Sequence, residues 1–265
     1  MAGDGVKDRI HRYLLDAGGE APVERIWRDC LHLVWDGAPT VQESLLEYLA
    51  QDPRFRIRGD RLSLSPEHDD PAILPIAEAP FTVVDIETTG TGATDGITEL
   101  AAVRVLGGGI EGSYATLVDP QQRIPAWITS FTGISQEMVR GQPTIAEALP
   151  EFLSFLGDRV LVAHNAPFDK RFLDRARRKL QGMEIPNPTL CTVRLARKYL
   201  PRLRRRNLDA VTQHLGIQVE GRHRALGDAV AAARVLLAVL ERAEAAGART
   251  VQDLLACGRV GSGPR

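Results

Sequence analysis

The sequence contains few cysteines and no long hydrophobic run. Its three cysteines in 265 residues, Cys30, Cys191 and Cys257, are far apart, which excludes a disulfide framework and a cysteine-based metal cluster. No apolar stretch approaches the roughly 18 residues of a membrane-spanning helix. The first residues carry acidic side chains instead of an apolar signal core. We therefore expect a cytoplasmic protein with no membrane partner.

The sequence also has no marked excess of positive or negative charge. There are 33 Lys and Arg residues and 34 Asp and Glu residues, which gives a formal net charge of −1. This balance excludes a chain that attracts polyanions through its overall charge, so any such contact must come from local clusters. Hydrophobic residues make up 44% of the chain, enough for one large domain or two small ones with buried cores.

A proline-rich stretch divides the chain. Residues 65–80 read SPEHDDPAILPIAEAP, with four prolines, several acids and little periodicity, which indicates a linker. We expect a small module over residues 1–64, a larger domain over 81–245 and a C-terminal tail over 246–265.

The small module shows three short segments of helical periodicity and then a hairpin pattern. Residues 54–65 read RFRIRGDRLSLS, in which alternating apolar residues flank a turn at Gly59 and Asp60. This order is typical of a winged-helix-like α+β domain. It predicts nucleic-acid contact through the third helix and the wing arginines, or else a protein-binding module or a cap on the larger domain. Nine Lys and Arg against eleven Asp and Glu in residues 1–64 leave these interpretations open.

The larger domain alternates strand and helix patterns. Apolar, β-branched runs predict strands over 81–87, 97–105, 110–118 and 159–162. Helical spacing predicts helices after Thr144 and over 167–180, 192–200, 208–215 and 225–245. An antiparallel hairpin, one later strand and then helices predict an α/β fold with a mixed sheet flanked by helices.

Three short segments place acids at the ends of these elements. VVDIETTG ends the first strand of the larger domain, and its Asp85 and Glu87 leave the same face because strand side chains alternate. HNAPFD puts Asp169 in the first turn of a helix, and HRALGDA puts His223 and Asp228 at the start of an Ala-rich helix. Each segment alone fits an ordinary solvent-facing or helix-terminal acid. Together, four acids and a histidine in apolar surroundings predict one site.

Four convergent carboxylates predict a metal site. Without a counter-charge they would repel one another and raise each other's pKa values. All-oxygen ligands suit two divalent ions, Mg²⁺ or Mn²⁺, and two such ions are a known device for phosphodiester cleavage. A nearby imidazole such as His223 can take the proton of the attacking water.

These motifs resemble those of the DEDDh family of 3′–5′ exonucleases, which has a ribonuclease H-like fold. FTGIS at 131–135 and RNLDAV at 206–211 extend the similarity over about residues 80–243, toward the exonuclease domains related to the epsilon subunit of bacterial DNA polymerase III. The resemblance implies that His223 is the general base, since a sister class has tyrosine there. The metal ligands that it implies are Asp85, Glu87, Asp169 and Asp228.

The resemblance also implies residues that bind the substrate. Thr88 would meet the terminal nucleotide, and His164 and Asn165 would shape the site. The small module and the short tail are not part of the usual epsilon pattern. We therefore expect a nuclease with an added module, through which a polymerase or repair partner would bind.

Positive charge is concentrated between the second and third motifs. Residues 169–206 contain thirteen Lys and Arg against three acids. Arg171 is one of six cations on one predicted helix, and four arginines between 202 and 206 fill the next loop. Such runs are commonly solvated helix faces, but this asymmetry favours contacts to substrate phosphates, with Arg171 as a candidate.

Three functions follow from the sequence. The first is removal of nucleotides from single-stranded DNA 3′ ends, in repair or proofreading. The second is an exoribonuclease, because recognition of the 2′-OH depends on few side chains. The third is a non-catalytic winged-helix binding protein, which loss of any of the five site residues would have favoured; all five are present.

Overall fold

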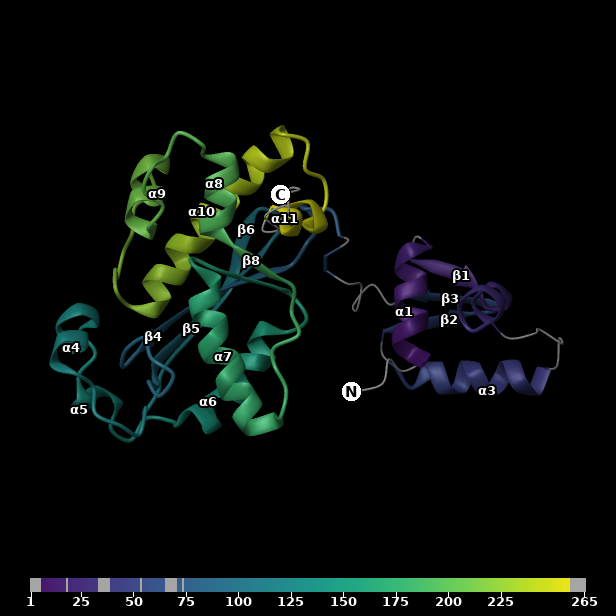
Figure 1. The fold of residues 1–265 in the computed structure, drawn as a ribbon, viewed down its shortest axis with the longest axis horizontal. Coiled ribbons are helices and arrows are strands. Elements are labelled where there is room, and N and C mark those ends of the chain that lie inside the picture. Colours follow the sequence, from purple (N-terminus) through teal and green to yellow (C-terminus); the bar gives the residue numbers. More distant parts are fainter. Residues whose placement is uncertain are drawn as a thin grey trace, which may run out of the picture. The chain divides into compact units, whose positions relative to one another are not determined.

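The structure is a computed structural model that describes residues 6–257, except 18, 33–38, 53, 65–70 and 73. The chain divides into an amino-terminal unit, Met1–Leu74, and a carboxy-terminal unit, Pro75–Arg265 (Figure 1). In the described part of the chain, none of the helices combines the length and the apolar character that a membrane crossing requires.

The amino-terminal unit is a small α+β fold. Its elements are α1 (Val6–Asp16), β1 (Glu20–Pro22), α2 (Val23–Arg25), the π-helical η1 (Ile26–Cys30), α3 (Pro39–Ala50), β2 (Phe55–Arg58) and β3 (Arg61–Leu64). The predicted hairpin is confirmed, since β2 and β3 pair with Phe55 opposite Leu64. The three-residue β1 adds an edge strand that the sequence pattern did not indicate. The winged-helix interpretation stays a prediction.

A five-stranded mixed sheet forms the centre of the carboxy-terminal unit, as predicted. Its strands are β4 (Phe81–Thr88), β5 (Ile97–Leu106), β6 (Gly109–Leu117), β7 (Val160–Ala163) and β8 (Thr189–Cys191). Their spatial order is β6-β5-β4-β7-β8. Strands β4, β5 and β6 are antiparallel neighbours, whereas β7 and β8 continue the sheet in parallel with β4.

Helices cover both faces of this sheet (Figure 1). On one face lie α6 (Ile145–Leu156) and α7 (Ala166–Gln181); on the other lies α10 (Ala225–Ala245), against which α8 (Thr192–Tyr199) and α9 (Leu208–Leu215) pack. Val84 and Ile86 belong to the core cluster that includes Phe152 of α6 and Phe172 of α7. Because side chains alternate along a strand, Asp85 and Glu87 lie on the α10 face.

Short elements complete the carboxy-terminal unit, two within the expected domain and one in the expected tail. They are α4 (Ala126–Thr132), α5 (Gln136–Val139) and α11 (Val251–Ala256). Residues 75–80, expected in the linker, contact residues expected in the tail: the backbone N–H of Ile76 donates to the carbonyl of Arg249 at 2.9 Å. Residues 65–70 and 73 of the expected linker, and 258–265 of the expected tail, lie outside the described residues.

A close backbone approach fixes the start of α10. The carbonyls of Glu220 and Gly221 lie so near Gly227 that a Cβ atom there would collide with both. Gly227 belongs to the HRALGDA motif, so the absence of a side chain lets the preceding loop fold back onto the helix.

We expect Gly227→Ala to destabilise the carboxy-terminal unit by about 2 kcal/mol or more, because overpacking against backbone cannot be relieved by a rotamer change. Urea unfolding measures this change. Gly112→Ala in β6 is the matched control, since a Cβ there meets no atom within 4 Å. Equal stability of the two variants would contradict the close approach.

Candidate active site

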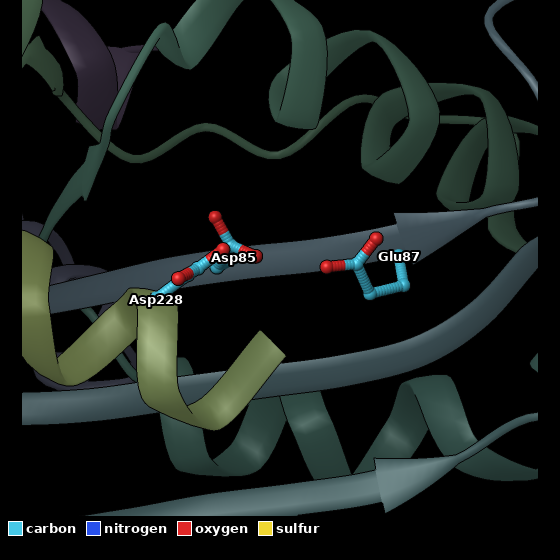
Figure 2. Close-up of side chains that lie close together, drawn as sticks. All are labelled: Asp85, Glu87 and Asp228. Atoms are coloured by element: carbon cyan, nitrogen blue, oxygen red, sulfur yellow. The ribbon is translucent and has the colours of Figure 1, made fainter. Parts of the chain in front are cut away.

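Three carboxylates meet where β4 passes the start of α10. Asp85, Glu87 and Asp228 each offer an oxygen within 4.8 Å of the others. Figure 2 shows the first two side chains on the strand and the third on the neighbouring helix. Strand alternation sets Asp85 and Glu87 on one face, and the first turn of α10 brings Asp228 to that face.

The other two predicted motif residues border the same cavity. This cavity has a volume of about 660 Å³, and its walls include the three carboxylates, Asp169 and His223. Asp169, only 3% exposed, stands in the first turn of α7. The structure therefore brings together all five residues that the motifs indicated, with Asp169 beside the tight group of three rather than within it.

Burial and mutual repulsion disfavour the charged forms of these acids. Burial raises the pKa of Asp85 well above its ordinary value, and Asp169, Asp228 and Glu87 raise it further. Burial, with repulsion from Asp228, raises the pKa of Glu87 to about 8. Burial also raises the pKa of Asp169 to about 8, although backbone N–H donors oppose this shift. The site lacks the positive charge that would let all four ionise together at neutral pH.

The donor set fits a divalent cation. The buried Oδ1 atom of Asp228 has no hydrogen-bond partner, which is unusual for a carboxylate oxygen. Its Oδ2 atom accepts from the guanidinium of Arg222, which also binds Asp209 with Nε to Oδ1 at 2.5 Å. Arg222 thus supplies one positive charge at the edge of the carboxylates. Hard oxygen ligands of this kind suit Mg²⁺ or Mn²⁺, as the sequence predicted.

The histidine of the third motif sits in an unusual backbone conformation. His223 has a φ of 62°, in the left-handed region that non-glycine residues rarely adopt. Its ring lies 4.1 Å, centroid to centroid, from the ring of Phe131, which also lines the cavity. The arginines on either side of His223 are both held by acids, so ion pairs fix the strained residue from both sides.

Glu99 of β5 is the acid that holds Arg224, the arginine after His223. It lies directly opposite Glu87 in the sheet and is 4% exposed. Its Oε1 atom accepts from Nη2 of Arg224 at 2.6 Å. Its Oε2 atom accepts from the backbone N–H of Ala225, the first residue of α10, at 2.8 Å. Glu99 therefore joins the sheet to the segment that carries His223 and Asp228.

The sequence reasoning missed Glu99, Arg222 and Phe131. An acid within the apolar run 97–105 was a signal for the first. The exposed aromatics of α4, Phe131 and Trp127, were a weaker signal, because single exposed apolar residues are common. Arg222 directly precedes the third motif and gave no signal of its own.

His164 and Asn165 line the cavity as structural residues. Nε2 of His164 lies 3.0 Å from the carbonyl of Arg206 and must donate to it, so Nδ1, 2.7 Å from Oγ1 of Thr192, accepts. Burial lowers the pKa of His164 to about 4, so the ring is neutral at pH 7. Asn165 begins α7 with a φ of 72°, a conformation that asparagine tolerates.

Two predicted substrate-binding residues are not on the cavity wall. The hydroxyl of Thr88 is buried and donates to the carbonyl of Gly90 at 2.6 Å. Nη2 of Arg171 donates to the carbonyl of Thr91 at 2.9 Å. These contacts hold the loop after β4, and the substrate-binding roles of Thr88 and Arg171 stay predictions.

The neighbouring cations of α7 are engaged in the same manner. Nζ of Lys170 lies 2.6 Å from Oδ2 of Asp174, and Nη1 of Arg175 donates to the carbonyl of Ala93 at 2.6 Å. Arg178 pairs with Glu184. Lys170, Arg175 and Arg178 thus contact neighbouring residues of the unit, and the expectation that this helix offers phosphate contacts stays a prediction.

Metal binding is expected to stabilise the protein more at high pH. Folded pKa values above the ordinary ones mean that the stability contributed by these acids is complete below about pH 4. It is lost as pH rises through about 8, the pKa of Glu87 and Asp169. Bound Mn²⁺ removes that loss, so a fixed Mn²⁺ concentration that is 100-fold above Kd at pH 8.5 raises Tm there by about 5–10 °C.

Thermal melts at pH 6 and pH 8.5, with and without Mn²⁺, measure this difference. The rise in Tm is expected to be larger at pH 8.5 and to shrink in Asp85→Asn. A rise that is independent of pH would contradict the raised pKa values.

Loss of the Glu99 charge is expected to destabilise the carboxy-terminal unit. Glu99→Gln leaves Arg224 without its carboxylate and costs about 2–3 kcal/mol, less than the loss of a fully buried pair because Arg224 is partly exposed. Glu111→Gln is the matched control, since the Glu111 carboxylate is 39% exposed against 5% for Glu99 and its pair with Arg159 contributes under about 1 kcal/mol. Urea unfolding of both variants measures the contrast, and equal losses would show that Glu99 is no special anchor.

Comparison with known proteins gives this geometry a family. The family described as Exonuclease (RNase_T) matches residues 82–236. The chain is 41% identical over 167 residues to the DNA polymerase III subunit epsilon of Aquifex aeolicus, covering 63% of this chain and 83% of that protein. It is 47% identical over 157 residues to the PolC-type DNA polymerase III of Clostridium perfringens, covering 59% of this chain but only 11% of that much longer protein.

A solved structure agrees with the sequence comparison. Exonuclease X in complex with 5′ overhanging duplex DNA superposes with a TM-score of 0.55 and 28% sequence identity, covering 67% of this chain and 99% of that one. Residues 82–236, which the family matches, contain the three motifs and nearly all of the sheet that carries them. The chain therefore belongs to the exonuclease family.

Proposed function

We propose that this chain removes nucleotides from the 3′ ends of single-stranded DNA, by hydrolysis that depends on two divalent metal ions. The convergence of Asp85, Glu87 and Asp228 within 4.8 Å carries the proposal. Such a group, with Asp169 beside it, can bind divalent cations that contact a phosphodiester. Without cations, the negative charges of the acids would repel the phosphate.

The side chains divide the work of hydrolysis. A water oxygen forms a bond to phosphorus, the bond from phosphorus to the 3′ oxygen breaks, and a nucleoside monophosphate leaves. His223, on the cavity wall and packed against Phe131, takes the proton of the water. The four carboxylates bind the metal ions, which when present would lower the pKa of the water and stabilise the leaving oxygen. His164 keeps the wall in place as a neutral ring.

DNA is the proposed substrate because of the relatives. The A. aeolicus relative is a DNA polymerase subunit, and exonuclease X was solved with duplex DNA that has a 5′ overhang. These similarities also support a role in repair or proofreading. The amino-terminal unit, with its hairpin arginines, is proposed to contact nucleic acid or a polymerase or repair partner.

The proposal predicts a metal-dependent ladder that shortens from the 3′ end. Matched 5′-labelled single-stranded DNA and RNA are incubated with the full chain and Mg²⁺, Mn²⁺ or EDTA. Asp85→Asn is expected to slow cleavage by about 10³-fold, since several kcal/mol of transition-state stabilisation are lost. Glu241→Gln, an exposed acid on α10, serves as the control and retains full activity.

Each alternative gives a different gel. Faster shortening of RNA would assign the chain to the exoribonucleases. Internal cuts, or shortening that persists in EDTA or in Asp85→Asn, would overturn the proposed site.

A further inference from the structure

One cation on the cavity wall has no acidic partner. Within the described part of the chain, the arginines that line this cavity are Arg206 and Arg222. Arg222 is neutralised by Asp209 and Asp228. Arg206 forms no ion pair in that part of the chain, and its buried Nε atom has no hydrogen-bond partner. Its Nη1 atom makes one long contact, 3.4 Å to the carbonyl of Arg204.

The backbone that carries this guanidinium is fixed from both sides. The carbonyl of Arg206 accepts from the half-buried His164 at 3.0 Å. The next residue, Asn207, caps α9 by accepting from the backbone N–H of Ala210 at 3.3 Å. The guanidinium of Arg206 is thus partly buried and held in place, and its Nε atom has no acceptor. We expect such a group to bind a ligand, because a buried donor without an acceptor costs free energy.

Arg206 differs in this respect from Lys170, Arg175 and Arg178 of the basic segment. These three residues of α7 hold loops or pair with acids. Arg202, Arg204 and Arg205 share the loop of Arg206, but they are exposed and are not on the cavity wall. The residue that combines positive charge, fixed position and access to the carboxylates is Arg206.

We propose that Arg206 binds a backbone phosphate of the nucleic-acid strand beside the carboxylates. The inference rests on the proposed function, because it takes the strand as ligand. A guanidinium presents several donors to phosphate oxygens and keeps its charge at every working pH. It offsets the repulsion between the strand and the acids of the same cavity, and it fixes the register of the strand.

The salt dependence of binding tests this contact. A fluorescent oligothymidylate is titrated with full-length Asp85→Asn, which is expected to cut it about 10³-fold more slowly, at several salt concentrations in Mg²⁺. Addition of Arg206→Met is expected to weaken binding about tenfold at low salt and to reduce the slope of log Kd on log salt by about 0.7, the value for one lost single-strand phosphate contact. Arg205→Met, a neighbour of equal charge, is expected to change Kd less than about twofold.

Cleavage kinetics provide a second readout. In the chain with Asp85 intact, Arg206→Met is expected to raise KM about tenfold with little change in kcat, since the phosphate contact is present in both ground and transition states. Arg206→Lys keeps the charge and is expected to retain most of the salt slope. Thermal melts of all variants are expected to coincide.

Each contrary result has its own meaning. An equal slope change in Arg205→Met and Arg206→Met would overturn the proposal in favour of diffuse attraction. Weaker binding in Arg206→Met with an unchanged slope would overturn it by showing an indirect effect on the wall. Normal binding by Arg206→Met would overturn the Arg206 contact alone, whereas failure of Asp85→Asn itself to bind the strand would remove both this proposal and the proposed function.

Discussion

Mutual repulsion among buried carboxylates is the constraint around which this fold is arranged. Asp85 and Glu87 share one strand face, Asp228 meets them from a helix, and Asp169 is buried beside them. Each would prefer solvent or a counter-charge. The protein keeps them together because sheet and helices are packed by apolar contacts on the other side of the strand, where Val84 and Ile86 lie. Function here costs stability, which the apolar packing offsets.

Arginine side chains fix the positions of the elements that form the site. Arg224 joins α10 to the sheet through Glu99, and Arg222 links Asp228 to Asp209 at the head of α9. Arg175 holds the loop that follows β4. These three arginines therefore hold elements of the fold together. From the sequence alone, a high density of arginines indicates a surface that binds polyanions. Of the two arginines that line the cavity in the described part of the chain, Arg206 is the one without an acidic partner.

The sequence predicted the strands, the last helix and the five motif residues well, because each depends on short-range information. The alternation of side chains along a strand places Asp85 and Glu87 on one face, and an Ala-rich run predicts α10. Glu99 and Arg224 are 125 residues apart, so no local pattern could reveal their contact. The contact of Arg171 with the carbonyl of Thr91 was not predicted, because a charge run looks alike whether its members face solvent or hold a loop. The three-residue strands β1 and β8 were too short for any periodicity to show.

The acids of the site are spread along the chain, and this spacing has a consequence for biosynthesis. Glu87 and Asp228 are 141 residues apart. At 5–20 residues per second, a ribosome needs roughly 7–30 s to pass from one to the other. During that interval the growing chain holds two acids of the cluster without the helix that completes it. A chain made in this order completes its carboxylate cluster late, because the helix that carries Asp228 follows the sheet that carries Asp85 and Glu87.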